Sequence, residues 1–171
     1  MRGERGRVLE ARPDEGRGRR RPAGGGGGRR RRRVLIVNGV SIWREVLTSH
    51  INRYSDLKVC GEAMGEQAGF EKVRRLRPHL VLTEILRAHD LGFIRELVQR
   101  HPRLRVLVFS FRDEETYARL ALEAGARGYL PKGVHGETLV EGIRKVLKGG
   151  VALSPHMAAR LLPGSRPQRS G

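Results

Sequence analysis

The sequence predicts an α/β fold in which a parallel sheet of five strands carries helices on both faces. Three observations lead to this prediction. From Val34 onward, short aliphatic runs alternate with segments of helical periodicity. The aliphatic runs show little internal alternation of polar and apolar residues, as is typical of strands buried on both faces. Pro or Gly stands at most borders between the two kinds of segment.

Each predicted strand is a short run rich in β-branched or aliphatic residues. The five strands are VLIV (34–37), LKVCGEA (57–63), LVLT (80–83), RVLVFS (105–110) and GYL (128–130). Parallel strands need crossover connections, and the right-handed rule leaves few topologies for them. The predicted fold is therefore a doubly wound, flavodoxin-like sheet of strand order 2-1-3-4-5.

Amphipathic helices are predicted after each strand. They are SIWREVLTSHI (41–51), EQAGFEKVRRL (66–76), FIRELVQR (93–100), DEETYARLALEAG (113–125) and GETLVEGIRKVLKGG (136–150). Pro78 and Pro102 end the second and third helices, whereas Gly125 and Gly149 end the fourth and fifth. The face of the first helix that we expect against the sheet consists of Ile42, Trp43, Val46, Leu47, His50 and Ile51.

A sixth helix is predicted in LSPHMAARLL, with Ser154 as its N-cap and Pro155 in its first turn. The residues that follow, PGSRPQRSG, are too few to form the three helices of a helix-turn-helix domain. The predicted division of the chain is a disordered arm (1–32), an α/β domain (33–150), a C-terminal helix (151–162) and a disordered tail (163–171).

The composition of the chain indicates in which cellular compartment the protein works. Cys60 is the only cysteine, so no intrachain disulfide can form, which favours a reducing compartment. No apolar run approaches the roughly 18 residues of a membrane span. The N-terminus also lacks the apolar region of a secretory signal. We therefore expect a cytoplasmic protein that does not enter a membrane.

The net charge of +17 is distributed unevenly. Residues 1–33 hold 13 Arg and 4 acids, whereas residues 34–162 hold 20 Lys or Arg and 14 acids. The N-terminal segment, with RGRRRPAGGGGGRRRRR, has almost nothing apolar to bury and is predicted to be disordered. Three explanations stay open: an electrostatic arm for nucleic acid or another anionic surface, a solvated tail, and a translation start further downstream.

Polar residues stand at the ends of four of the five strands. Asn38 and Gly39 follow the first strand, Glu84 follows the third, Ser110 ends the fourth and Lys132 follows the fifth. The carboxyl ends of parallel strands meet at one edge of the sheet, and ligands bind there at the switch point between the first and third strands. We therefore expect these five residues to form one site.

The spacing and the surrounding sequence resemble the receiver domain of two-component response regulators, in the subgroup usually joined to a LuxR-type helix-turn-helix. The matching segments are RVLIV, GEA, RPHLVLTEI, HPRLRVLVFS, EAGARGYLPK and EGIRKVLKGGVALSP. They cover roughly residues 33–162. The resemblance implies a bacterial signalling module and not an enzyme.

The resemblance also implies a role for each position of the site. Members of the family have an acidic pair that helps to bind Mg²⁺, and Asn38-Gly39 stands in its place. Glu84 stands at the phosphoacceptor position, where the family has an Asp that accepts phosphate from a histidine kinase. Ser110 and Lys132 match the residues that contact the phosphoryl oxygens. Tyr129 matches the aromatic residue whose packing changes on activation.

These departures predict a site without phosphoryl chemistry. Mg²⁺ prefers carboxylate oxygens, and only Glu84 remains, so we expect Mg²⁺ binding to be weak or lost. Glu is one methylene longer than Asp, and a misplacement of that size costs about 10²-fold in rate. We predict that Glu84 takes no part in a phosphorelay. An ion pair with Lys132 either mimics phosphorylation, drawing Ser110 and Tyr129 inward, or only fills the vacated site; we favour the second interpretation.

No catalytic or metal site is indicated elsewhere. The six His residues lack ligand spacing, and the sequence contains no nucleophile elbow, P-loop or Cys–His pair. The run GGGGG at 24–28 has no preceding strand and no following Lys-Ser or Lys-Thr, so it is not a phosphate loop. We therefore expect no enzymatic activity and no cofactor.

The sequence thus predicts a phosphorylation-independent, receiver-like module that acts by protein–protein contact. The resemblance implies docking or homodimerisation through the fourth helix, fifth strand and fifth helix, and it implies a sensor histidine kinase as a further partner. The residues expected to line that face are Tyr117, Leu120, Arg127 and Lys145. Two alternatives stay open: a conventional phosphoaccepting response regulator, and a nucleic-acid-associated protein that binds through the Arg-rich arm.

Overall fold

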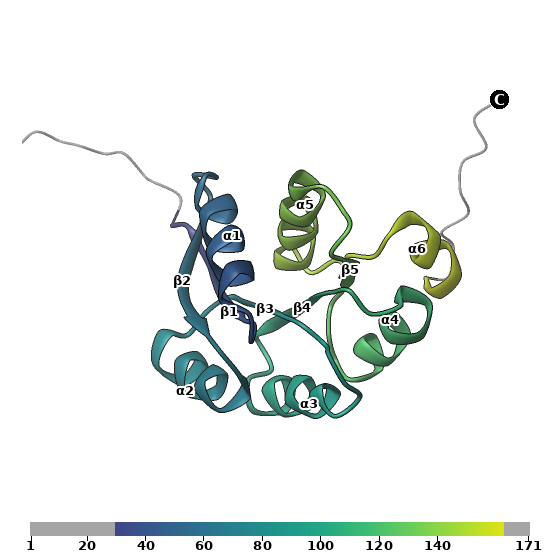
Figure 1. Ribbon diagram of the computed structural model, residues 1–171, viewed down its shortest axis with the longest axis horizontal. Coiled ribbons are helices and arrows are strands. Elements are labelled where there is room, and N and C mark those ends of the chain that lie inside the picture. Colours follow the sequence, from purple (N-terminus) through teal and green to yellow (C-terminus); the bar gives the residue numbers. More distant parts are fainter. Residues whose placement is uncertain (1–29, 163–171) are drawn as a thin grey trace, which may run out of the picture.

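The computed structural model describes residues 30–162, which form one five-stranded parallel sheet flanked by helices (Figure 1). The strands are β1 (Arg32–Val37), β2 (Leu57–Ala63), β3 (Leu80–Thr83), β4 (Arg105–Ser110) and β5 (Tyr129–Pro131). The helices are α1 (Ser41–Asn52), α2 (Glu66–Leu76), α3 (Asp90–Arg100), α4 (Glu114–Glu123), α5 (Gly136–Leu147) and α6 (Pro155–Leu161). The strand order β2-β1-β3-β4-β5, parallel throughout, confirms the predicted fold.

Two hydrophobic layers hold the helices to the sheet. Helices α1 and α5 cover one face, and α2, α3 and α4 cover the other (Figure 1). Successive residues of β1 alternate between the layers: Val34 and Ile36 pack with α1 and α5, whereas Leu35 and Val37 pack with the opposite helices. All four are buried, which explains why the strand reads as a continuous apolar run.

The predicted inner face of α1 is too wide. Leu47 and Ile51 are buried, but Ile42 and Val46 are exposed to 59% and 49%. These two residues lie about 100° around the helix from Trp43 and Leu47, at the edge of the stripe that one helix can bury. The inner face of α1 is therefore narrower than its apolar sequence suggests.

Capping interactions fix the helix ends that the sequence indicates. The Asp113 carboxylate accepts from the backbone N–H of Thr116 at 2.8 Å, and the Ser154 hydroxyl accepts from Met157 at 3.2 Å. Gly125 and Gly149 have φ values of +105° and +96°, which a residue with a side chain rarely adopts. The third helix begins at Asp90, three residues before the predicted start.

Helix α6 packs on α4 and not on the sheet (Figure 1). Met157 is buried in the layer that contains α4. On the outside, the Glu115 carboxylate of α4 accepts from His156 at 3.0 Å and from Arg160 at 2.9 Å. The C-terminal helix therefore covers part of the α4 surface.

The outer limits of the predicted domains stay predictions. Residues 1–29 and 163–171, which include most of the predicted arm and the whole predicted tail, lie outside the described residues. Within residues 30–162, no helix reaches the length and apolar character that crossing a membrane requires.

Gly128 lies where the backbone before β5 approaches Ala152. A Cβ atom on Gly128 would stand 2.4 Å from the Ala152 carbonyl oxygen and 2.8 Å from Leu107 Cδ1. We expect Gly128→Ala to lower the free energy of unfolding by about 1–3 kcal/mol, because the backbone must shift. Urea unfolding measures the change. In the control Gly92→Ala, a Cβ meets nothing within 4 Å, so that variant should keep or slightly raise stability; an equal loss in both variants would contradict the steric explanation.

Candidate functional site

The predicted site residues meet at the carboxyl-terminal edge of the sheet, at the ends of the adjacent strands β1, β3, β4 and β5. At its centre, the Glu84 carboxylate lies 2.7 Å from the Lys132 ammonium, measured from Oε1 to Nζ. The other carboxylate oxygen, Oε2, accepts from the Asn38 amide nitrogen at 2.7 Å. The side chains of Lys132 and Glu84 are exposed to only 1% and 6%. Both oxygens of a buried carboxylate are therefore occupied by protein donors.

Asn38 is held in one orientation by its surroundings. Its Oδ1 accepts from the backbone N–H of Val40 at 2.8 Å, so the amide nitrogen must face Glu84. The Asn38 backbone N–H donates to Ala63 O at 2.9 Å, and its carbonyl accepts from Arg44 at 2.8 Å. Asn38 thus presents a hydrogen-bond donor to Glu84, while its side-chain oxygen is used by the Val40 N–H. Gly39, next to it, is exposed and has no side chain to contribute.

Two aromatic rings lie next to the Lys132 ammonium. Its Nζ lies 4.4 Å from the ring centroid of Trp43 and 4.9 Å from that of Phe111. The two rings pack edge to face with centroids 5.5 Å apart. Such contacts contribute about 0.5–2 kcal/mol each, with the larger values for desolvated cations. Phe111 was missed by the sequence reasoning; its position directly after Ser110 was the available signal.

The Ser110 hydroxyl hydrogen-bonds to the backbone and not to the ion pair. Ser110 is fully buried, and its hydroxyl donates to the Ile85 carbonyl at 2.7 Å while accepting from the Arg112 backbone N–H at 3.2 Å. Only the backbone of Ser110 meets Lys132, whose N–H donates to Ser110 O at 2.9 Å. The Glu84–Lys132 pair is formed, but it does not draw the Ser110 hydroxyl toward it.

Tyr129 is fully buried and points inward. Its hydroxyl donates to the Arg112 carbonyl at 2.7 Å, and the Arg112 Nε donates to Leu86 O at 2.7 Å. Burial raises the pKa of Tyr129 to about 12. The inward position of this ring is therefore coupled to the two loops that follow β3 and β4.

A second group of ligand-type side chains lies nearby but has a structural role. Among residues 30–162, Glu66, His89 and Asp90 bring ligand-type atoms within 4.8 Å of one another, which the sequence spacing did not indicate. The Asp90 carboxylate accepts from the backbone N–H groups of Leu86 and Arg87 at 2.7 and 2.9 Å, and it contacts His89 at 3.0 Å. Asp90 therefore stabilises the start of α3.

Removing Lys132 should leave Glu84 as an uncompensated buried charge. We expect Lys132→Met to lower the free energy of unfolding by about 3–5 kcal/mol. In the double variant Glu84→Gln/Lys132→Met, the amide oxygen at position 84 still accepts from Asn38, so most of this loss should be recovered. Denaturant unfolding of Lys132→Met, Glu84→Gln and the double variant measures the coupling free energy between the two side chains. Additive effects would show that the pair is not coupled.

Alkaline stability should report on Tyr129. In the unfolded chain its pKa is near 10, so between about pH 10 and 12 the folded state keeps a proton that the unfolded state has lost. Stability therefore falls as the pH rises through this window. We expect Tyr129→Phe to make this fall shallower, at a cost of about 1 kcal/mol at neutral pH for the lost hydrogen bond. Urea midpoints against pH test this, with Tyr117→Phe as the matched control; an unchanged slope in Tyr129→Phe would refute the assignment.

Comparison with known proteins identifies the family. The family model of the response regulator receiver domain matches residues 34–144. Response regulator GacA of Pseudomonas protegens is 31% identical over 132 residues, which are 75% of this chain and 62% of GacA. Transcriptional regulatory protein LnrK of Bacillus subtilis is 33% identical over 132 residues, covering 75% of this chain and 60% of LnrK.

The similarity extends to a solved structure. A LuxR-family two-component response regulator from Aurantimonas sp. has a TM-score of 0.70 at 28% identity, over 75% of this chain and 93% of that one. The chain spans less than two thirds of the length of GacA and LnrK. The family match, the strand order and these relatives agree: the chain belongs to the response regulator receiver domains of two-component systems, which are signalling modules and not enzymes.

Proposed function

We propose that this receiver domain signals without phosphorylation and acts through contact with another protein. The observation that carries the proposal is that both oxygens of the Glu84 carboxylate are already engaged by protein donors. Lys132 occupies one carboxylate oxygen and Asn38 the other, both at 2.7 Å. An attack of Glu84 on a phosphoryl group would compete with these two contacts, and breaking a buried ion pair costs several kcal/mol.

The donor set does not fit Mg²⁺. The metal takes oxygen ligands in near-octahedral geometry and usually needs carboxylates. Asn38 directs its NH₂ group at Glu84, because its side-chain oxygen accepts a hydrogen bond from the Val40 backbone N–H. Gly39 has no side chain. Phosphoryl transfer depends on neutralising charge, largely through the metal. Among residues 30–162, Lys132 is the cation that pairs with Glu84.

The arrangement favours a fixed conformation over a phosphate-driven change. Lys132, the residue that would contact a phosphoryl group, is enclosed by Glu84, Trp43 and Phe111. Ser110, the second such residue, is bonded to Ile85 O. The Tyr129 hydroxyl bonds to the Arg112 carbonyl and the Ser110 hydroxyl to the Ile85 carbonyl, so both hydroxyls donate to the backbone and not to Glu84.

Receiver domains interact with kinases and other partners and often dimerise. We place the partner or homodimer contact on the α4–β5–α5 face, where Arg127 and Lys145 are exposed. Tyr117 and Leu120 are half-buried and pack with the core layer that also includes Leu161 of α6. A partner on this face therefore meets α6 and the outer part of α5 more than the apolar residues of α4. The location of this signalling in the bacterial cytoplasm is part of the same proposal.

Treatment with acetyl phosphate and Mg²⁺ tests the phosphorylation-independent role. We expect the wild-type chain to show no acid-labile shift on a phosphate-sensitive gel, and beryllofluoride to leave Trp43 fluorescence unchanged. A Cβ on Gly39 would touch only Met64 O, at 3.7 Å, so an acid fits there. The variant Asn38→Asp/Gly39→Asp/Glu84→Asp should therefore gain the shift.

The single variant Glu84→Asp is the matched control for this experiment. It restores the phosphoacceptor without the metal ligands, so it should gain far less phosphate than the triple variant. A shift in the wild-type chain that Glu84→Ala abolishes would overturn the proposal.

A further inference from the structure

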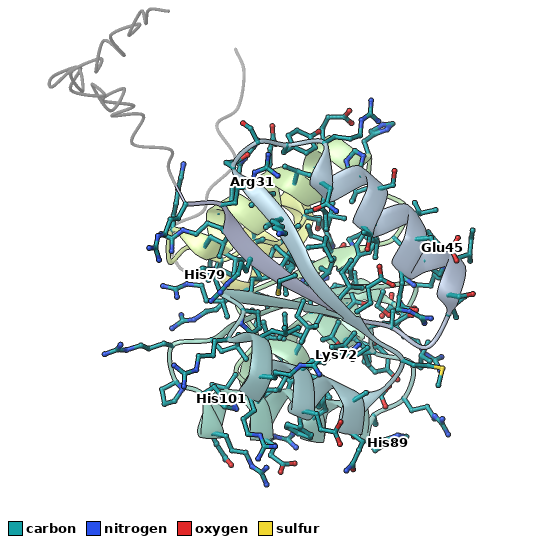
Figure 2. The ribbon with its side chains drawn as sticks, turned by 90° about the vertical axis from the view of Figure 1, so that its left-hand side faces the viewer. Arg31, Glu45, Lys72, His79, His89 and His101 are labelled. Atoms are coloured by element: carbon teal, nitrogen blue, oxygen red, sulfur yellow. The ribbon has the colours of Figure 1, made fainter. Side chains whose placement is uncertain are left out.

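The edge of the sheet opposite to Glu84 carries a concentration of positive charge. Because all strands are parallel, the start of every strand and the last turn of α1, α2, α3 and α5 lie at this end. Arg32 begins β1, Lys58 is the second residue of β2 and Arg105 begins β4. Figure 2 shows Arg31, His79 and His101 on this side of the molecule, and Glu45 and His89 on the opposite side. We call this surface the basic end.

Two adjacent cavities hollow the basic end. The first, of about 670 Å³, is lined by six arginines and no acid. These are Arg32, Arg74, Arg77, Arg100, Arg103 and Arg105. The second, of about 1190 Å³, shares Arg32 and adds Arg30, Arg31, Arg33, Lys58, Arg144 and Lys148. Apart from one aspartate, Asp56, every charged side chain that lines the two cavities is basic.

Little of this charge is neutralised within the fold. Asp56 is already engaged by Arg144 in a two-pronged pair of 2.9 and 2.8 Å, which also lowers the pKa of its carboxyl. Arg100 pairs with Glu96. The pKa of His79, between the cavities, is lowered by burial and then by the charges of Arg32 and Arg33. The positive charges at the basic end therefore help to lower the pKa of a histidine in the same surface.

Interactions with helix dipoles explain only some of the positive side chains at the basic end. A positive residue in the last turn of a helix is favourable, which explains Arg74, Arg100 and Arg144. Arg32 and Lys58 lie in strands, and Arg103 lies in the loop before β4, so none of the three belongs to the last turn of a helix. Like charges held together in this way destabilise a fold unless something negative binds to them.

We propose that the basic end binds the phosphodiester backbone of nucleic acid, without reading base sequence. The large apolar side chains that are exposed among residues 30–162 lie toward the other end of the sheet. They are Val40, Ile42, Val46, Met64, Leu86 and Phe111. A membrane-binding surface needs apolar groups to insert, and the basic end offers none of these.

The kind of contact follows from the side chains present. The Tyr54 ring near this end is covered by Arg144, at 5.0 Å, and by His50, so it is not free to stack on a base. Three strand spacings separate Lys58 in β2 from Arg105 in β4, on the order of 14 Å. A duplex carries one negative charge per about 1.7 Å of its axis, so a surface of this width meets several phosphates. Arg30, Arg31 and Arg32, the first residues that the structure describes, line the same surface.

The test is fluorescence anisotropy with a labelled DNA duplex, titrated with the full-length chain at several salt concentrations. The variant Lys58→Gln/Arg74→Gln/Arg103→Gln removes three exposed charges from the two cavities. We expect it to reduce the slope of log K against log salt by about 2–3, and to weaken binding by about 10- to 100-fold near physiological salt.

The matched control is Arg87→Gln/Arg95→Gln/Arg119→Gln, which removes the same charge from exposed positions outside both cavities. It should bind nearly as the wild-type chain does, and circular dichroism should show both variants folded. Equal weakening of the two variants, or no DNA binding by the wild-type chain, would overturn the proposal. Tighter binding to vesicles of equal parts phosphatidylserine and phosphatidylcholine than to the duplex would replace nucleic acid with a membrane and would also overturn it.

Discussion

The buried ion pair between Glu84 and Lys132 is the interaction on which the functional edge of this domain depends. Two opposite charges with almost no exposed surface are stable together only if each finds further partners, because their desolvation is expensive. Asn38 supplies the second donor to the carboxylate, and the rings of Trp43 and Phe111 supply the second contact to the ammonium. The pair thereby joins the ends of β1, β3, β4 and β5 and the start of α1 in a single arrangement.

This arrangement explains the conformation of the residues around it. With the Lys132 charge already balanced at 2.7 Å, the Ser110 hydroxyl has no anion to approach, and it bonds to Ile85 O instead. Tyr129 is held inward by the Arg112 carbonyl, a bond that does not involve Glu84. The pair is formed and the Tyr129 ring is buried, but the Ser110 hydroxyl bonds to Ile85 O. Whether the pair mimics phosphorylation or only fills the vacated site stays a prediction.

The backbone of the site was predictable and its side-chain orientations were not. Parallel strands bring their carboxyl ends together, so the approach of Glu84 to Lys132 follows from the strand order and the positions in the sequence. The direction of the Asn38 amide depends on the Val40 N–H, and the cover over Lys132 depends on the rotamer of Phe111. Such choices arise from packing that no pattern along the chain encodes. The same reason applies to Ile42 and Val46, whose spacing fits the inner face of α1 but whose exposure is set by the width of the contact.

The parallel sheet gives the molecule two ends of different chemistry. At the carboxyl edge, the Glu84 and Lys132 charges are paired beside aromatic rings, and the large exposed apolar side chains lie toward this edge. At the amino edge, arginines gather with a single acid among them. The two ends lie at opposite edges of the sheet, so each presents its own surface to other molecules. The positive charge of the amino edge depends on residues at the strand starts, the helix ends and the adjoining loops, and not on the pair between Glu84 and Lys132.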